Sequence, residues 1–224
     1  MKRREFSLAS VGAVAASSLA LAPFGAAQAQ GMAPKAGTDY NVLKTAAPVD
    51  GASKGKIEVV EFFWYACPHC NAFEPTLESW LKQLPKDVAF RRVPVNFQSS
   101  FVPPQKLFYT LEAMNLLPQM HGKVFQAIHV DHQKLDRDDA VIEWVAKQGI
   151  DKAKFTEVYN SFSVSAKVRQ ASQLQEAYKV EGVPALGVAG KFYTDGSLAQ
   201  GMPRALAIVD YLVAQERKAG PAKS

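Results

Sequence analysis

The chain of 224 residues has very little cysteine, and all of it lies in one place. Cys67 and Cys70 are its only two cysteines, and they stand three positions apart. This excludes the set of several disulfides that holds many small secreted domains together. The two thiols can form a disulfide only with each other or with another molecule.

Concentrated charge and metal-ligand spacing are also lacking. The formal net charge is +5, and the basic residues are spread along the chain rather than gathered in a stripe. This distribution argues against nucleic-acid binding. The histidines form no His-x3-His pair and there is no second Cys-x-x-Cys, so a zinc site is disfavoured. We expect no metal and no organic cofactor, and we expect His121, His129 and His132 to be ordinary surface or half-buried side chains.

Long apolar runs are limited to the N-terminus. Positive residues at 2–4 precede the mostly apolar residues 8–22, and Ala27-Gln28-Ala29 is a small-x-small motif. This order is typical of an export signal cleaved after Ala29. The apolar part is too short and too rich in alanine for a good membrane span. Arg3-Arg4 leaves Sec and twin-arginine export both open. A bacterial export signal predicts the periplasm, where disulfides persist.

Strand and helix patterns alternate along the rest of the chain. Residues 57–65 and 88–95 are predicted strands, and the nearly continuous apolar character of the first indicates burial in a parallel sheet. Pro94 predicts an edge or irregular position in the second strand. Helical spacing over residues 73–84 predicts a helix between them that begins at Pro68 and is kinked at Pro75.

Residues 101–163 have a different character, with only short helical patterns. Later segments predict a long helix, two short strands joined at Gly190 and a closing helix, at residues 165–180, 185–189, 192–194 and 204–218. We therefore predict an α/β domain, residues 30–100 and 164–224, interrupted by an all-helical insertion, residues 101–163.

The two cysteines lie where the first predicted strand ends and the helix begins. A disulfide across so short a loop stabilises a fold little, which favours a chemical role. Unpaired N–H groups and the helix dipole favour a thiolate at Cys67, and a protonated His69 would add to this effect. A thiolate with a low pKa is a good leaving group, so the disulfide should be an oxidant. We expect Cys70, inside the helix, to be the buried resolving thiol.

Several further motifs accompany this pair along the chain. They are Glu61-Phe62-Phe63, Val95-Asn96-Phe97, Asn160-Ser161-Phe162, Gly182-Val183-Pro184-Ala185 and Gly190-Lys191. Together with Cys67-Pro68-His69-Cys70, they resemble the thioredoxin superfamily and, within it, the DsbA family of periplasmic thiol:disulfide interchange proteins. The resemblance covers nearly all of residues 40–218. It implies a thioredoxin fold with a helical insertion.

The resemblance also implies roles for single residues. Cys67 matches the exposed nucleophile and Cys70 the resolving thiol, with Pro68 and His69 between them. Pro184 matches a cis-proline that faces the disulfide, and Val183 offers backbone hydrogen bonds to a substrate peptide. An ordinary trans Val183–Pro184 bond is the alternative.

Glu61 matches the buried acid of the family. A buried carboxylate is unfavourable without a partner or a function. We interpret Glu61 as an acid with a raised pKa that exchanges protons with Cys70, with Arg92 as a basic neighbour. The alternative is a partly exposed charge at the end of the strand.

We therefore predict a monomeric periplasmic enzyme that donates its Cys67–Cys70 disulfide to reduced, newly exported polypeptides. By resemblance, a DsbB-like membrane oxidase restores the disulfide. A disulfide isomerase or reductase is the main alternative, although residues 30–56 are too few for the dimerisation domain that the resemblance implies for isomerases. An exported binding module with a non-catalytic disulfide is less favoured.

Overall fold

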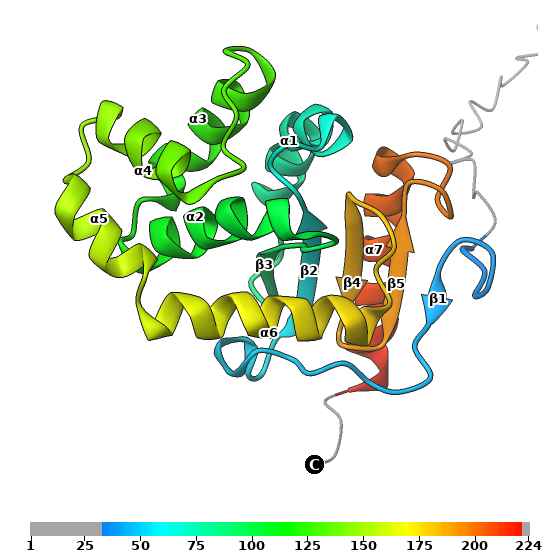
Figure 1. Ribbon diagram of the computed structural model, residues 1–224. Helices are drawn as coiled ribbons and strands as arrows, with labels where there is room; N and C mark the ends of the chain where they lie inside the picture. The colour runs from blue at the N-terminus through cyan, green and yellow to red at the C-terminus, as the bar shows by residue number, and fades with distance from the viewer. Residues whose placement is uncertain (1–32, 221–224) are drawn as a thin grey trace, which may run out of the picture. The chain divides into compact units, whose positions relative to one another are not determined.

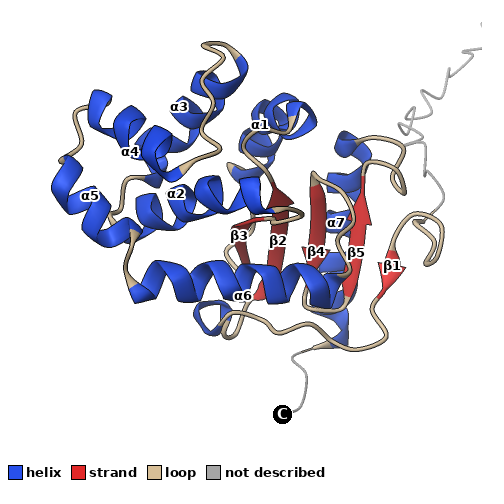
Figure 2. Ribbon diagram, in the orientation of Figure 1, coloured by secondary structure: helices blue, strands red, loops and turns tan. Residues whose placement is uncertain are grey.

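A mixed β-sheet is the framework of the described part of this computed structural model, which covers residues 33–220 (Figures 1 and 2). The predicted export signal, residues 1–29, lies outside the described residues. The strand order is β1-β5-β4-β2-β3. The strands are β1 (Asn41–Val42), β2 (Ile57–Phe63), β3 (Val88–Pro94), β4 (Ala185–Val188) and β5 (Phe192–Asp195). Among these strands of residues 33–220, β2 and β3 run parallel, and the other pairs are antiparallel.

Strand β2 is buried because it has neighbours on both sides and helices on both faces. It pairs with β3 and β4, and every residue from Glu58 to Phe63 is buried. The burial agrees with the nearly continuous apolar run in the sequence. The expected parallel sheet is correct only on one side of β2, because β2 runs parallel to β3 and antiparallel to β4. Strand β3 lies at the edge of the sheet, as Pro94 predicted.

Helices cover both faces of this sheet. They are α1 (Pro68–Leu81), α2 (Val102–Ala113), α3 (Leu117–His129), α4 (Asp138–Lys147), α5 (Lys152–Tyr159), α6 (Phe162–Tyr178) and α7 (Met202–Ala219). Figure 1 shows α6 and α7 on opposite faces. Apolar residues of α1 and α7 pack with Val59 and Leu186 in one core. Val60 and Phe62, which alternate with Val59, point into the other core.

The second core runs without a break from the sheet into the helical segment. It joins Val60 and Phe62 to Leu107 of α2, Val124 of α3 and Leu174 of α6. The arrangement confirms the thioredoxin fold with a helical insertion. The domain boundaries at residues 101 and 163 stay a prediction.

Local differences from the predicted elements have simple causes. Strand β1 was not predicted because it has two residues and both are exposed. Helix α6 begins at Phe162 rather than residue 165 because the Ser161 side chain accepts a hydrogen bond from the backbone N–H of Val164. Helix α1 continues through Pro75 to Leu81. Within residues 33–220, no helix is both long and apolar enough to span a membrane.

Candidate active site

Cys67 occupies the N-cap position of α1, and Pro68 is the first helical residue. The Cys67 sulfur accepts a hydrogen bond from the backbone N–H of Cys70 at 3.4 Å. Both cysteines are free thiols in this structure. Cys67 is only 7% exposed and Cys70 is fully buried. The nucleophile implied by the resemblance is thus mostly covered rather than openly exposed.

The two cysteines have opposite electrostatic environments. The pKa of Cys67 is lowered to about 6, mainly because the Cys70 side chain donates a hydrogen bond to its sulfur. Burial opposes this shift, whereas the backbone N–H groups of Cys70 and His69 and the charge of His69 lower the pKa further. Burial raises the pKa of Cys70 well above its ordinary value, and the Cys67 hydrogen bond raises it further. His69 itself is exposed. At neutral pH the pair therefore holds a thiolate at Cys67 and a thiol at Cys70.

The loop before β4 approaches the same sulfur from the other side. The Val183–Pro184 peptide bond is cis, the isomer that the resemblance implied. The Cys67 sulfur lies 3.5 Å from the carbonyl oxygen of Val183, to which it donates a hydrogen bond in its thiol form. A groove of about 550 Å³ lies between this loop and α1, and His69, Phe73 and Pro184 are among its lining residues.

Glu61 is fully buried in the middle of β2, directly opposite Arg92 of β3. The Arg92 side chain donates a hydrogen bond from Nε to Glu61 Oε2 at 3.0 Å. Burial raises the pKa of Glu61 to about 8. The Arg92 charge acts in the opposite direction and lowers this pKa, whereas the charges of Glu74 and Glu78 raise it further. The Glu61 charge is in turn one of the causes that raise the pKa of Cys70. Both observations fit the predicted buried acid beneath the redox pair.

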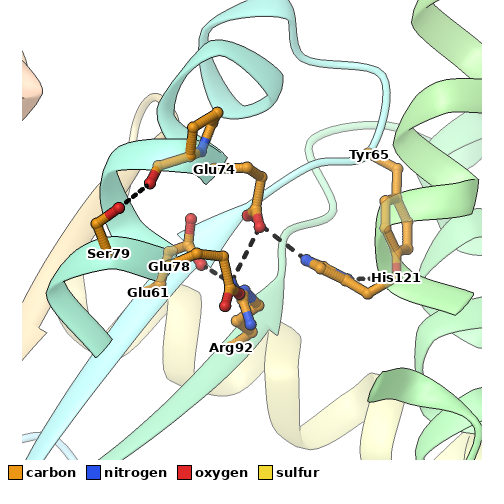
Figure 3. A network of polar contacts seen from close by, with 8 residues as sticks. Glu61, Tyr65, Glu74, Glu78, Ser79, Arg92 and His121 are labelled. Carbon is orange, nitrogen blue, oxygen red and sulfur yellow. Dashed lines mark hydrogen bonds and ion pairs between the residues drawn. The ribbon is translucent and has the colours of Figure 1, made fainter. Parts of the chain in front are cut away.

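Figure 3 shows a wider polar cluster around this acid. Arg92 Nη2 also donates to Glu74 at 3.0 Å and to Glu78 at 2.8 Å, both on α1. His121 of α3 lies beside Glu74, with 3.5 Å between Nε2 and Oε1. The sequence interpretation missed Glu74 and Glu78, whose four-residue spacing in a predicted helix places them on one face. It also treated His121 as an ordinary histidine, whereas His121 is only 9% exposed.

The remaining predicted histidines differ in position. His132 is exposed, as expected. The His129 ring nitrogen Nε2 lies 2.8 Å from the carbonyl oxygen of Tyr65, two residues before Cys67. Among residues 33–220 no group of three or more histidine, cysteine, aspartate or glutamate side chains is placed to hold a metal ion.

Comparisons with known proteins agree with this geometry. The model of the DSBA-like thioredoxin domain family matches residues 93–207. A thiol:disulfide interchange protein DsbA from Burkholderia cepacia is 43% identical over 191 residues, which cover 85% of this chain and 90% of that protein. The chain belongs to the DsbA-like thioredoxin family. Its relative from Azotobacter vinelandii, of the same name, is 45% identical over 86% of this chain and 90% of that protein.

Solved structures of the family extend the comparison to the fold. The crystal structure of Pseudomonas aeruginosa DsbA has a TM-score of 0.78 and 43% identity, and covers 83% of this chain and 95% of that chain. The crystal structure of the DsbA of Xylella fastidiosa has a TM-score of 0.76 and 28% sequence identity, and the match covers 83% of this chain and 98% of that chain. This DsbA-like protein is accordingly a thiol:disulfide oxidoreductase, with a redox-active cysteine pair in place of a bound cofactor.

Proposed function

We propose that this protein acts in the periplasm, where the disulfide between Cys67 and Cys70 oxidises pairs of thiols in reduced, newly exported polypeptides. The periplasmic location is supported by the signal-like residues 1–29 and by membership of the family. The observation that carries the direction of electron flow is the contrast between the two cysteines. The pKa of Cys67 is lowered to about 6, while that of Cys70 is raised.

The reaction follows from this contrast in two displacement steps. A substrate thiolate attacks the Cys67 sulfur, the bond to Cys70 breaks, and Cys70 leaves as a thiolate that takes a proton. A second substrate thiolate attacks the substrate sulfur of this mixed disulfide, and Cys67 leaves as a thiolate. The substrate loses two electrons, which the two cysteines gain. The low pKa of Cys67 makes it the better leaving group in the second step, which favours substrate oxidation.

Other site residues have supporting roles in this proposal. His69 and the first N–H groups of α1 stabilise the Cys67 thiolate, and Pro68 begins the helix that presents them. Glu61, with a pKa of about 8, gives the proton to the leaving Cys70. Val183 and Pro184 bind the substrate backbone beside the groove.

The reduced protein must be reoxidised before it can act again. We propose a DsbB-like membrane oxidase as the electron acceptor, as the family implies, and a monomer as the working form. The same groove beside His69 and Pro184 is available to this partner and to substrates in turn.

A redox titration of the exported form against glutathione tests the proposal. We expect a potential more oxidising than about −200 mV, in the range of oxidising compartments, whereas structural disulfides lie below about −300 mV. A potential in that lower range would refute an oxidase and favour a reductase. Cys70→Ser should accumulate a mixed disulfide with a peptide that carries a disulfide, because the Cys67 thiolate displaces one peptide sulfur and no Cys70 thiol is present to resolve the product; mass spectrometry detects it. Cys67→Ser, the matched control, should accumulate none.

A further inference from the structure

Two histidines of α3 hold the segment that leads from β2 into the redox pair. The hydroxyl of Tyr65 lies 2.8 Å from His121 Nδ1, and its backbone carbonyl oxygen lies 2.8 Å from His129 Nε2. The two histidines are eight residues apart, so two helical turns place them on nearly the same face. Tyr65 is buried among aromatic rings, in edge contact with Phe63 and Phe125. The helical insertion therefore contacts the active-site segment through polar groups as well as apolar packing.

The contact with Tyr65 determines which nitrogen of His121 carries a proton. A neutral imidazole has one donor and one acceptor nitrogen. Burial raises the pKa of Tyr65 well above its ordinary value, so its hydroxyl keeps its proton and can donate to Nδ1. The imidazole proton then lies on Nε2, which faces Glu74 Oε1 at 3.5 Å. Among the described residues neither of these two buried atoms has a hydrogen bond within the usual limits, so this contact is the closest that each has to a partner.

The other carboxylate oxygen of Glu74, Oε2, accepts a hydrogen bond from Arg92, and three glutamates share this arginine. Its guanidinium donates to Glu61, Glu74 and Glu78. Any shift of Glu74 toward Arg92 therefore competes with Glu61 for the same positive charge. Glu61 is the fully buried member of the three carboxylates, whereas Glu74 and Glu78 are partly exposed, so Glu61 depends most on the hydrogen bond from Arg92.

We propose that His121 is a positioning residue for proton exchange at Cys70. It holds Glu74 on the α3 side of Arg92 and so limits the competition between Glu74 and Glu61 for the guanidinium. The inference rests on the proposed role of Glu61 as the proton donor to Cys70. It gives the helical insertion a part in the chemistry, through a residue that does not touch the reacting sulfur atoms.

The environment of His121 favours a neutral imidazole that can donate a hydrogen bond from Nε2. Glu74 and Glu78 face it from α1 and Arg92 from β3. Arg91 and Glu112 line the same cleft of about 990 Å³, which gives solvent a route to Glu74 and His121. Burial lowers the pKa of His121, and the Arg92 charge also lowers it, whereas the contact with the Glu74 carboxylate raises it. The net lowering keeps the ring neutral at the pH at which Glu61 titrates.

The test is a titration of Glu61 in the reduced exported protein, followed by NMR of ¹³C-labelled glutamate carboxyl groups. Glu61→Gln identifies the resonance by its loss. We expect His121→Phe to raise the midpoint of Glu61 by about one pH unit, the equivalent of a partly lost charge-assisted hydrogen bond. His121→Gln, which retains an N–H donor, should return the midpoint close to that of the wild type.

Two further variants complete the design. Tyr65→Phe keeps the aromatic packing but removes the group that fixes the imidazole proton, and should raise the midpoint by a smaller amount. It also serves as the test if His121→Phe does not fold. His132→Asn removes an exposed histidine and should leave the midpoint unchanged.

Two results would overturn the inference. One is a midpoint that does not rise in His121→Phe and Tyr65→Phe. The other is an equal rise in His121→Phe and His121→Gln, which would show that ring shape rather than the donor is responsible. The titration involves no turnover, so the glutathione experiment on the wild type tests the proposed function separately.

Discussion

The Cys67 thiolate predicts that the reduced protein gains stability relative to Cys67→Ser as the pH rises. The pKa of Cys67 is lowered from 9.0 to about 6 in the folded state. A lowered acid pKa stabilises the folded state fully above the unfolded pKa, and this contribution is lost as the pH falls through the folded pKa. The stability difference between the two proteins should therefore change between pH 6 and pH 9, and the stabilisation by the thiolate should be largest near pH 9.

The size of the effect follows from the same shift. One pKa unit corresponds to about 1.4 kcal/mol, so two units between pH 6 and pH 8 set an upper limit of about 3 kcal/mol. The helix end that provides the N–H groups includes the exposed residues Pro68 and His69. Solvent screening there reduces the expected gain at pH 8 to about 2 kcal/mol.

Urea unfolding of both reduced proteins at pH 5.5, 6.5, 7.5 and 8.5 measures this gain. Glu61 has the opposite effect, because its raised pKa makes its contribution fall as the pH rises toward about 8. It is present in both proteins, so the difference between the two curves removes it to first order. Serine is itself a good N-cap, which adds a constant offset but no slope. Parallel curves, together with a Cys67 alkylation midpoint near 9, would refute the thiolate argument.

Three other substitutions give sharp expectations. Glu61→Gln should slow the reduction of the disulfide by a dithiol tenfold or more, toward the roughly 10²-fold typical of general acid catalysis; an unchanged rate in stopped-flow fluorescence would contradict the proton role. Gly187→Ala would place a Cβ 2.4 Å from the Tyr178 ring, and should destabilise the fold by about 1–3 kcal/mol in urea unfolding; full stability would show that the ring can move. Ser161→Ala removes the cap that binds the Val164 N–H, and should lower the free energy of unfolding by about 1 kcal/mol, whereas Ser161→Asn should retain most of it.

Features that depend on neighbours in the sequence were predictable. The apolar run of β2, the switch to helical spacing after Cys67 and the position of Pro68 together place the cysteines at a helix start, as the structure has them. Arg92 was expected only as a basic neighbour of Glu61, and the structure places the two residues directly opposite each other on β2 and β3.

Features that depend on distant packing were not predictable. His121 is separated from Tyr65 by 56 residues, and nothing in its surroundings in the sequence distinguishes it from His132. Its burial follows from the way α3 packs against the segment before Cys67. The near-complete burial of Cys67 has a similar origin, because the loop with Val183 lies against it from 116 residues away.

Burial, together with the sharing of Arg92 among three carboxylates, explains why Glu61 can hold a proton at neutral pH. A buried carboxylate with a guanidinium to itself would have a lowered pKa and would remain ionised. Here Glu74 and Glu78 divide the charge of Arg92, and burial prevails, so that the pKa of Glu61 reaches about 8. An acid in this range is protonated when Cys70 leaves and still able to accept the proton back when Cys70 must attack. The two glutamates of α1 therefore serve the proposed chemistry by weakening the ion pair beneath it.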